Sequence, residues 1–95
     1  MNFHKVFSVD GYEVISANAK KRCNKNENRR DRKSHLTITN CKQNCDQAAN
    51  CKYFAFVVYV NYNVCKTYNE CEESALEDAN NHQTIYKKIE GKQNK

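Results

Sequence analysis

Residues 41–65 read CKQNCDQAANCKYFAFVVYVNYNVC and contain four of the six cysteines of the chain. Cys41 and Cys45 are four residues apart, so on a helix both thiols lie on one face. Three residues that favour helix N-caps precede this pair: Thr37, Thr39 and Asn40. The sequence therefore predicts a short helix over about residues 38–49, with both cysteines available to attach it to the rest of the fold.

The segment KYFAFVVYV, residues 52–60, is an apolar run rich in β-branched and aromatic residues, which is typical of a buried strand. Because side chains alternate along a strand, one face carries Phe54, Phe56, Val58 and Val60, and the other carries Tyr53, Ala55, Val57 and Tyr59. We expect the Phe face to pack against the helix, and the Tyr face to be exposed or half-covered. A turn at 61–63 and a return strand at 64–68 complete a hairpin.

The size and cysteine content indicate one small domain that depends on disulfides. The chain has 95 residues, 39% of them hydrophobic, so its core is marginal. Six cysteines can form three disulfides, each contributing about 2–4 kcal/mol, in an oxidising compartment. Zinc modules use closely spaced cysteine pairs, whereas successive cysteines here are 18, 4, 6, 14 and 6 residues apart. We therefore expect six bridged cysteines and no metal.

The chain has no apolar run long enough to span a membrane, and its first residues, MNFHKVFSVDGYEV, lack the apolar core of a signal peptide. Together with the expected disulfides, this indicates a piece of a longer secreted or cell-surface protein. Further strands are expected at 3–9 and 12–16, around an Asp10-Gly11 turn, and at 84–89. Residues 70–78 are expected to form one or two helical turns or a loop, which Asn80-Asn81-His82 ends.

The stretch AKKRCNKNENRRDRK, residues 19–33, is strongly basic. Eight cations less two acidic residues, Glu27 and Asp31, leave a net charge of +6, which exceeds the +5 of the whole chain. Ala19 and Cys23 are its only apolar residues, so we expect a solvated loop tethered at Cys23. The candidate ligand-binding residues are its cations: Lys20, Lys21, Arg22, Lys25, Arg29, Arg30, Arg32 and Lys33.

This basic loop has two interpretations, a solvated insertion or a site for polyanions. Four of its eight cations are arginines, whose planar forks suit sulfate and phosphate groups. Nucleic-acid binding has the same electrostatic signature. Since disulfides indicate a compartment without nucleic acid, we expect no nucleic-acid partner.

A family resemblance rests on the following pattern: Cys41-x3-Cys45-x5-Cys51-x2-Phe54-x-Phe56, then Cys65 and a closing strand that bears Tyr86. This pattern resembles the PAN/apple domain, and the C-x-x-Y-x-x-C motif at 65–71 is similar to apple modules of apicomplexan and ciliate surface proteins. The resemblance covers roughly residues 5–89 of a single domain, 1–95. It implies an α+β fold in which a curved antiparallel sheet of about five strands cradles one helix.

The resemblance also implies three disulfides: Cys41–Cys65, Cys45–Cys51 and Cys23–Cys71. The chain departs from the family at Thr67, where a leucine is usual, and in the basic character of residues 19–33.

The function that the resemblance implies is a non-catalytic adhesive module that binds a protein or a carbohydrate. In parasites this means host-cell attachment or assembly of invasion complexes, with a host or self protein as partner. We expect the basic loop to bind sulfated glycan or an acidic protein face. Tyr53, Tyr59 and Tyr62 are expected either to stack on sugar rings or to be buried in the sheet.

Two other classes of function were compared with this one. A structural or assembly domain would pack on neighbouring domains or partner proteins, and it predicts a large exposed apolar patch. An enzyme is not expected, because the chain has no glycine-rich phosphate loop, no H-E-x-x-H and no G-x-S-x-G. We therefore expect no catalytic residue and no cofactor.

Overall fold

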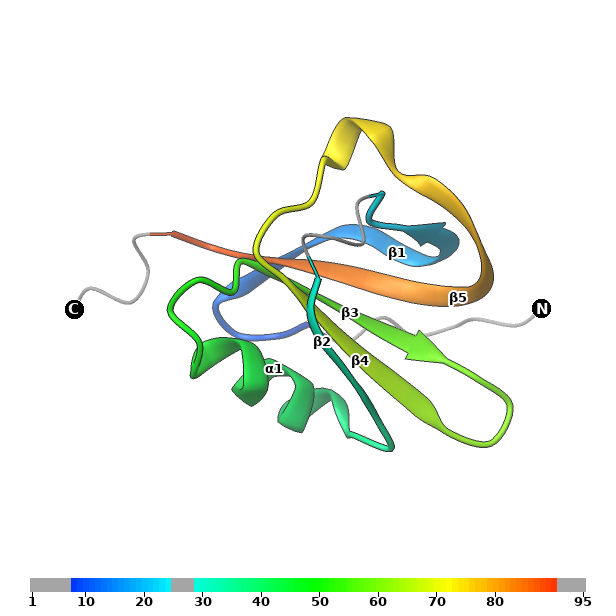
Figure 1. The fold of residues 1–95 in the computed structure, drawn as a ribbon, viewed down its shortest axis with the longest axis horizontal. Helices are drawn as coiled ribbons and strands as arrows, with labels where there is room; N and C mark the ends of the chain where they lie inside the picture. Colours follow the sequence, from blue (N-terminus) through cyan, green and yellow to red (C-terminus); the bar gives the residue numbers. More distant parts are fainter. Residues whose placement is uncertain (1–7, 25–28, 91–95) are drawn as a thin grey trace.

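A computed structural model describes residues 8–24 and 29–90 of the chain. The elements are β1 (Tyr12–Arg22), β2 (Arg29–Ser34), α1 (Ile38–Asp46), β3 (Tyr53–Val58), β4 (Asn63–Tyr68), the 3-10 turn η2 (Glu73–Ala75) and β5 (Glu77–Lys88). The strands form one antiparallel sheet in the order β1-β5-β3-β4-β2. Figure 1 shows α1 on one side of this curved sheet and η2 on the other. The fold is a small disulfide-rich α+β domain, as predicted.

The helix α1 begins where the sequence predicts and ends earlier. The Thr37 side chain accepts a hydrogen bond from the Asn40 backbone N–H at 3.1 Å, which makes Thr37 the N-cap. The helix ends at Asp46 rather than at residue 49. A continued helix would place residue 51 about 9 Å along the axis from Cys45, whereas their disulfide requires a Cα–Cα distance of 5.3 Å. The chain therefore has to turn back before Cys51.

The core between α1 and the sheet is built around Phe54, which is fully buried. Its ring stacks on Tyr86 with centroids 4.6 Å apart and forms a T-shaped pair with Tyr12, with centroids 5.0 Å apart. Two disulfides, Cys41–Cys65 and Cys45–Cys51, join the helix to β4 and to the start of β3 within the same core. The expected packing of the Phe face against the helix is confirmed at Phe54 and at the partly buried Phe56.

The opposite face of the sheet carries a second core, so the Tyr face of β3 is neither exposed nor half-covered there. Tyr53, Ala55 and Val57 are all buried. The third disulfide, Cys23–Cys71, lies in this second core, and Leu76 beside η2 packs against it. All six cysteines are therefore bridged, in the pairs that the resemblance implied.

The prediction of one solvated loop over residues 19–33 is wrong. Residues 19–22 belong to β1 and residues 29–33 to β2, while 25–28 lie outside the described residues. Both strands are edges of the sheet, where one face of a polar strand can remain in water while its backbone groups bond to the neighbouring strand. Because these segments are hydrophilic, their backbone pairing in the sheet could not be recognised from the sequence.

The polar segment before the last strand was also misassigned. Residues 80–82, which were expected to end the helical turns or loop of residues 70–78, lie inside β5, which runs for 12 residues and pairs with β1. The helical prediction for 70–78 holds only for the short η2 turn. Strand 12–16 is confirmed as the first part of β1, and it pairs with β5. Ser8 and Val9 are not in a strand, and residues 3–7 lie outside the described residues.

Candidate anion-binding surface

The structure separates the cations that lie together in the sequence. Lys20, Lys21 and Arg22 belong to β1, Arg29, Arg30, Arg32 and Lys33 belong to β2, and Lys25 lies outside the described residues. Since β1 and β2 are opposite edges of the sheet, most of the described cations are divided between two separate strands, and only Arg22 at the end of β1 lies close to Lys66 and the β2 arginines.

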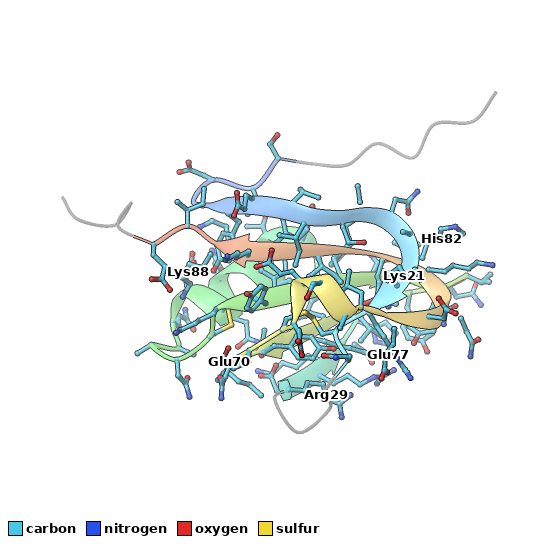
Figure 2. All side chains as sticks on the ribbon, turned by 90° about the horizontal axis from the view of Figure 1, so that it is seen from above. Lys21, Arg29, Glu70, Glu77, His82 and Lys88 are labelled. Atoms are coloured by element: carbon cyan, nitrogen blue, oxygen red, sulfur yellow. A yellow bond between two sulfur atoms is a disulfide. The ribbon has the colours of Figure 1, made fainter. Side chains whose placement is uncertain are left out.

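Two cations of β1 are paired with carboxylates at the start of β5. Lys21 Nζ lies 2.6 Å from Asp78 Oδ1, and an Arg22 guanidinium nitrogen lies 3.3 Å from Glu77 Oε1. Figure 2 shows Lys21 and Glu77 at one end of β5 and Lys88 at the other. Such exposed pairs add little to stability, but they neutralise part of the positive charge of β1.

Arg30 takes part in a structural network. It donates a hydrogen bond to Thr67 Oγ1 at 2.9 Å, and the Thr67 hydroxyl donates to Asp31 Oδ1 at 2.6 Å. Asn44 of α1 donates to both Asp31 oxygens, at 3.3 and 3.1 Å. Thr67 is fully buried. Thr67 therefore carries a hydroxyl that helps to connect β2, β4 and α1.

Four cations meet on the sheet face opposite α1, and we call them the outer basic cluster: Arg22, Arg29, Arg32 and Lys66. Across the β2–β4 pair, Arg32 is the register partner of Lys66 and Arg29 is the partner of Tyr68. Burial lowers the pKa of Lys66, and the positive charges of Arg29, Arg32 and Arg22 lower it further. The ammonium group of Lys66 therefore experiences positive charge that its surroundings do not fully compensate.

The strand alternation and one disulfide explain how these side chains meet. Cys65 and Thr67 point toward α1, so Lys66 between them points to the other side. The Cys23–Cys71 disulfide holds the end of β1 next to the segment that follows β4, which brings Arg22 close. Sequence reasoning missed Lys66 because it considered only residues 19–33. The available signal was the charged residue between apolar Val64 and Tyr68 on one strand face.

The three tyrosines considered as ligand contacts have different environments. Tyr53 is only 8% exposed, and its hydroxyl donates to Glu73 Oε2 at 3.0 Å, an atom that also lies 2.9 Å from Lys87 Nζ. Burial is therefore the correct interpretation for Tyr53. Tyr59 and Tyr62 lie instead at the β3–β4 turn, where their rings stack.

A pocket of about 710 Å³ lies beside α1. Within it, Asp46 accepts hydrogen bonds from the Tyr12 hydroxyl at 2.8 Å and from Lys42 Nζ at 2.6 Å. Lys88 Nζ donates to the Cys45 carbonyl at 3.1 Å. Because these polar groups bond to one another, their arrangement serves to attach α1 to the ends of β1 and β5.

Acid should weaken this attachment. Burial raises the pKa of Asp46, but hydrogen bonds from Lys42 and Tyr12 and nearby positive charge outweigh it, so the pKa lies below its ordinary value. A carboxyl group of this kind stabilises the fold above its unfolded pKa, about 3.9, and the stabilisation is lost as pH falls through the folded pKa. We expect Asp46→Asn to reduce the pH dependence of the unfolding free energy below about pH 5.

Urea denaturation at a series of pH values measures this effect. Asp10→Asn, which removes an exposed carboxylate from the rim of the same pocket, controls for the loss of one negative charge. An Asp46→Asn variant whose stability declines with acid as steeply as that of the wild type contradicts the prediction.

The three disulfides fit an extracellular or secreted protein, because such bonds persist in oxidising compartments. In the described parts of the chain, α1 is too short and too polar to cross a bilayer, and no other helix could do so. Scans of this chain against protein-family models, curated proteins and solved structures found no match.

Proposed function

We propose that this chain is a PAN/apple-like, non-catalytic adhesive module of a secreted or cell-surface protein, and that it binds acidic ligands through the outer basic cluster. The ligand is a sulfated glycan or an acidic face of a host or self protein. The cysteine spacing, the five-stranded sheet with one helix and the arrangement of the disulfides support the family assignment. In a parasite surface protein, such a module would serve host-cell attachment or invasion.

The observation that carries the proposal is the concentration of positive charge at Arg29, Arg32 and Lys66; the fourth member of the outer basic cluster, Arg22, is paired with Glu77. Burial is the main cause of the lowered pKa of Lys66, and repulsion from the neighbouring arginines adds to it; a sulfate or carboxylate placed among Arg29, Arg32 and Lys66 would relieve that repulsion. Arginine forks bind such groups in a bidentate manner, and hydrogen bonds to charged groups are roughly twice as strong as neutral ones. Arg29 and Arg32 are both exposed, so a ligand in solution can reach them.

Retention on immobilised heparin across a salt gradient tests the proposal. The double variant Arg29→Glu, Arg32→Glu should lose about 100-fold in heparin affinity, because two charge-assisted contacts become repulsive. The control, Lys20→Glu with Lys52→Glu, changes the net charge by the same amount at two exposed positions outside the cluster. It should elute close to the wild type.

Equal elution of the two double variants would show that only net charge matters and would refute the cluster as a site. The structural alternative, a domain that packs on its neighbours, predicts a broad apolar patch. In the described residues only four large apolar or aromatic side chains are exposed, and three of them are in or beside one turn. We therefore favour the adhesive function.

A further inference from the structure

The turn between β3 and β4 concentrates exposed apolar surface. Val60 is 97% exposed, Val58 48% and Tyr62 37%; the fourth exposed large apolar side chain of the described residues, Val14 at 39%, lies on β1. We call residues 58–63 the hairpin tip. Figure 1 shows this tip extending away from the sheet at the lower right, far from η2 at the top.

The hairpin tip is ordered by ring stacking and backbone hydrogen bonds. The rings of Tyr59 and Tyr62 stack with centroids 4.9 Å apart and an interplanar angle of 13°, and the His35 ring also stacks on Tyr62, with centroids 5.2 Å apart. The Tyr59 N–H donates to the Tyr62 carbonyl at 2.9 Å, and the His35 N–H donates to the Asn63 carbonyl at 2.7 Å. Little conformational entropy therefore remains to be lost when the tip binds a surface.

The charged residues nearest to the hairpin tip along β2 and β4 are lysines. Residues 53–64 contain no charged side chain, and residues 32–45 and 47–69 contain no aspartate or glutamate. The nearest cations on the adjoining strands are Lys33 on β2, paired in register with Cys65, and Lys66 on β4. Lys66 is four residues from Tyr62, about 13 Å along the strand. Asp31, the closest acidic residue in β2, is bonded inward to Thr67 and Asn44.

We infer that the hairpin tip inserts into the interfacial region of a lipid bilayer that carries anionic headgroups. The aliphatic Val60 and the uncharged Asn61 lie at the apex of the turn, the tyrosine rings flank them, and the lysines follow along the strands. This order matches the depth profile of a bilayer surface, in which acyl chains lie below an interface that favours aromatic rings, and anionic headgroups attract basic residues. A projecting tip needs no complementary groove when its partner is a deformable lipid surface, and this favours lipid over a protein partner.

A single-tryptophan reporter tests the inference, because the chain has no tryptophan of its own. Val60→Trp places the reporter at the tip, and Val14→Trp places it at the exposed apolar position on β1 as a matched control. With phosphatidylcholine vesicles that contain phosphatidylserine, the emission of Val60→Trp should shift to shorter wavelength while that of Val14→Trp does not. Val60→Asp should reduce cosedimentation with the same vesicles by at least about tenfold, because one buried aliphatic side chain is lost and the new carboxylate is repelled by the anionic headgroups.

Three results would overturn the inference: no emission shift for Val60→Trp, the same shift for Val14→Trp, or the same shift with vesicles of phosphatidylcholine alone. Cosedimentation without a shift would show adsorption through the outer basic cluster only, and it also counts against insertion. A tip that binds a protein instead would give no shift with any vesicle. The inference shares Lys66 with the proposed glycan site, but the two can be told apart, since Val60→Asp should reduce vesicle binding and leave heparin retention unchanged.

Discussion

Replacing both Cys23 and Cys71 with alanine is expected to lower the free energy of unfolding by about 4 kcal/mol, the largest loss among the three disulfides. This bond closes the longest loop, with a sequence separation of 48 residues, compared with 24 for Cys41–Cys65. The cross-link restricts the unfolded chain, and this restriction grows with loop length. The same relation predicts a loss of about 3.5 kcal/mol for the pair Cys41 and Cys65.

The Cys45–Cys51 bond spans only 6 residues, so its removal should cost about 2 kcal/mol. Removing both cysteines of each pair leaves no unpaired thiol, and urea denaturation of the three double variants gives the ranking. If the packing of the cysteine side chains rather than loop closure determined the losses in stability, the ranking of the three disulfides would change. Cys41, Cys45, Cys51 and Cys65 are all fully buried, whereas Cys71 is 7% exposed. A larger loss for the Cys45 and Cys51 pair than for the Cys23 and Cys71 pair contradicts the loop-closure account.

Phe54→Ala is expected to lower the free energy of unfolding by about 3–5 kcal/mol, as is usual for truncating a buried phenylalanine. Phe54 is 0% exposed and lies between the rings of Tyr86 and Tyr12, at centroid distances of 4.6 and 5.0 Å. Its removal would leave a cavity, and the disulfides around the same core limit how far the neighbouring elements can move to fill it. Thermal and urea unfolding measure the loss.

Phe56→Ala is the matched control, because it removes the same side chain from the same face of β3 at a position that is only partly buried. Its cost should be clearly smaller than that of Phe54→Ala, since less apolar surface returns to water. Equal losses would show that the hairpin as a whole, rather than the core under α1, determines stability.

The elements that the sequence predicts well are those defined by neighbouring residues. A capping threonine before Cys41, an apolar alternating run at 52–60 and a turn with its return strand are local signals, and each corresponds to an element with boundaries shifted by three residues or fewer. The early end of α1 was missed because it depends on the position of Cys51, which a helical pattern does not contain.

The edge strands could not be identified in the same way. Segments 19–22, 29–34 and 77–83 are polar, and they become strands because distant backbone groups pair with them. Pairings such as Lys21 with Asp78 and Arg32 with Lys66 join residues far apart in the sequence. No periodicity within a short segment reports such partners.

The candidate anion-binding surface, like the strands, was predictable in its local properties and not in its long-range contacts. Composition and cysteine count are properties of the chain itself, so they were sufficient to predict a small disulfide-dependent domain with a basic surface, whereas the α+β architecture was implied by the family resemblance. The sequence did not indicate which cations lie together at the surface. In the folded chain Lys21 pairs with Asp78, Arg30 bonds to the buried Thr67, and Lys66 lies beside Arg29 and Arg32. A sequence shows only which charges are neighbours along the chain. The electrostatic field at the surface depends instead on strand order, on side-chain alternation and on the disulfide that joins β1 to the segment after β4.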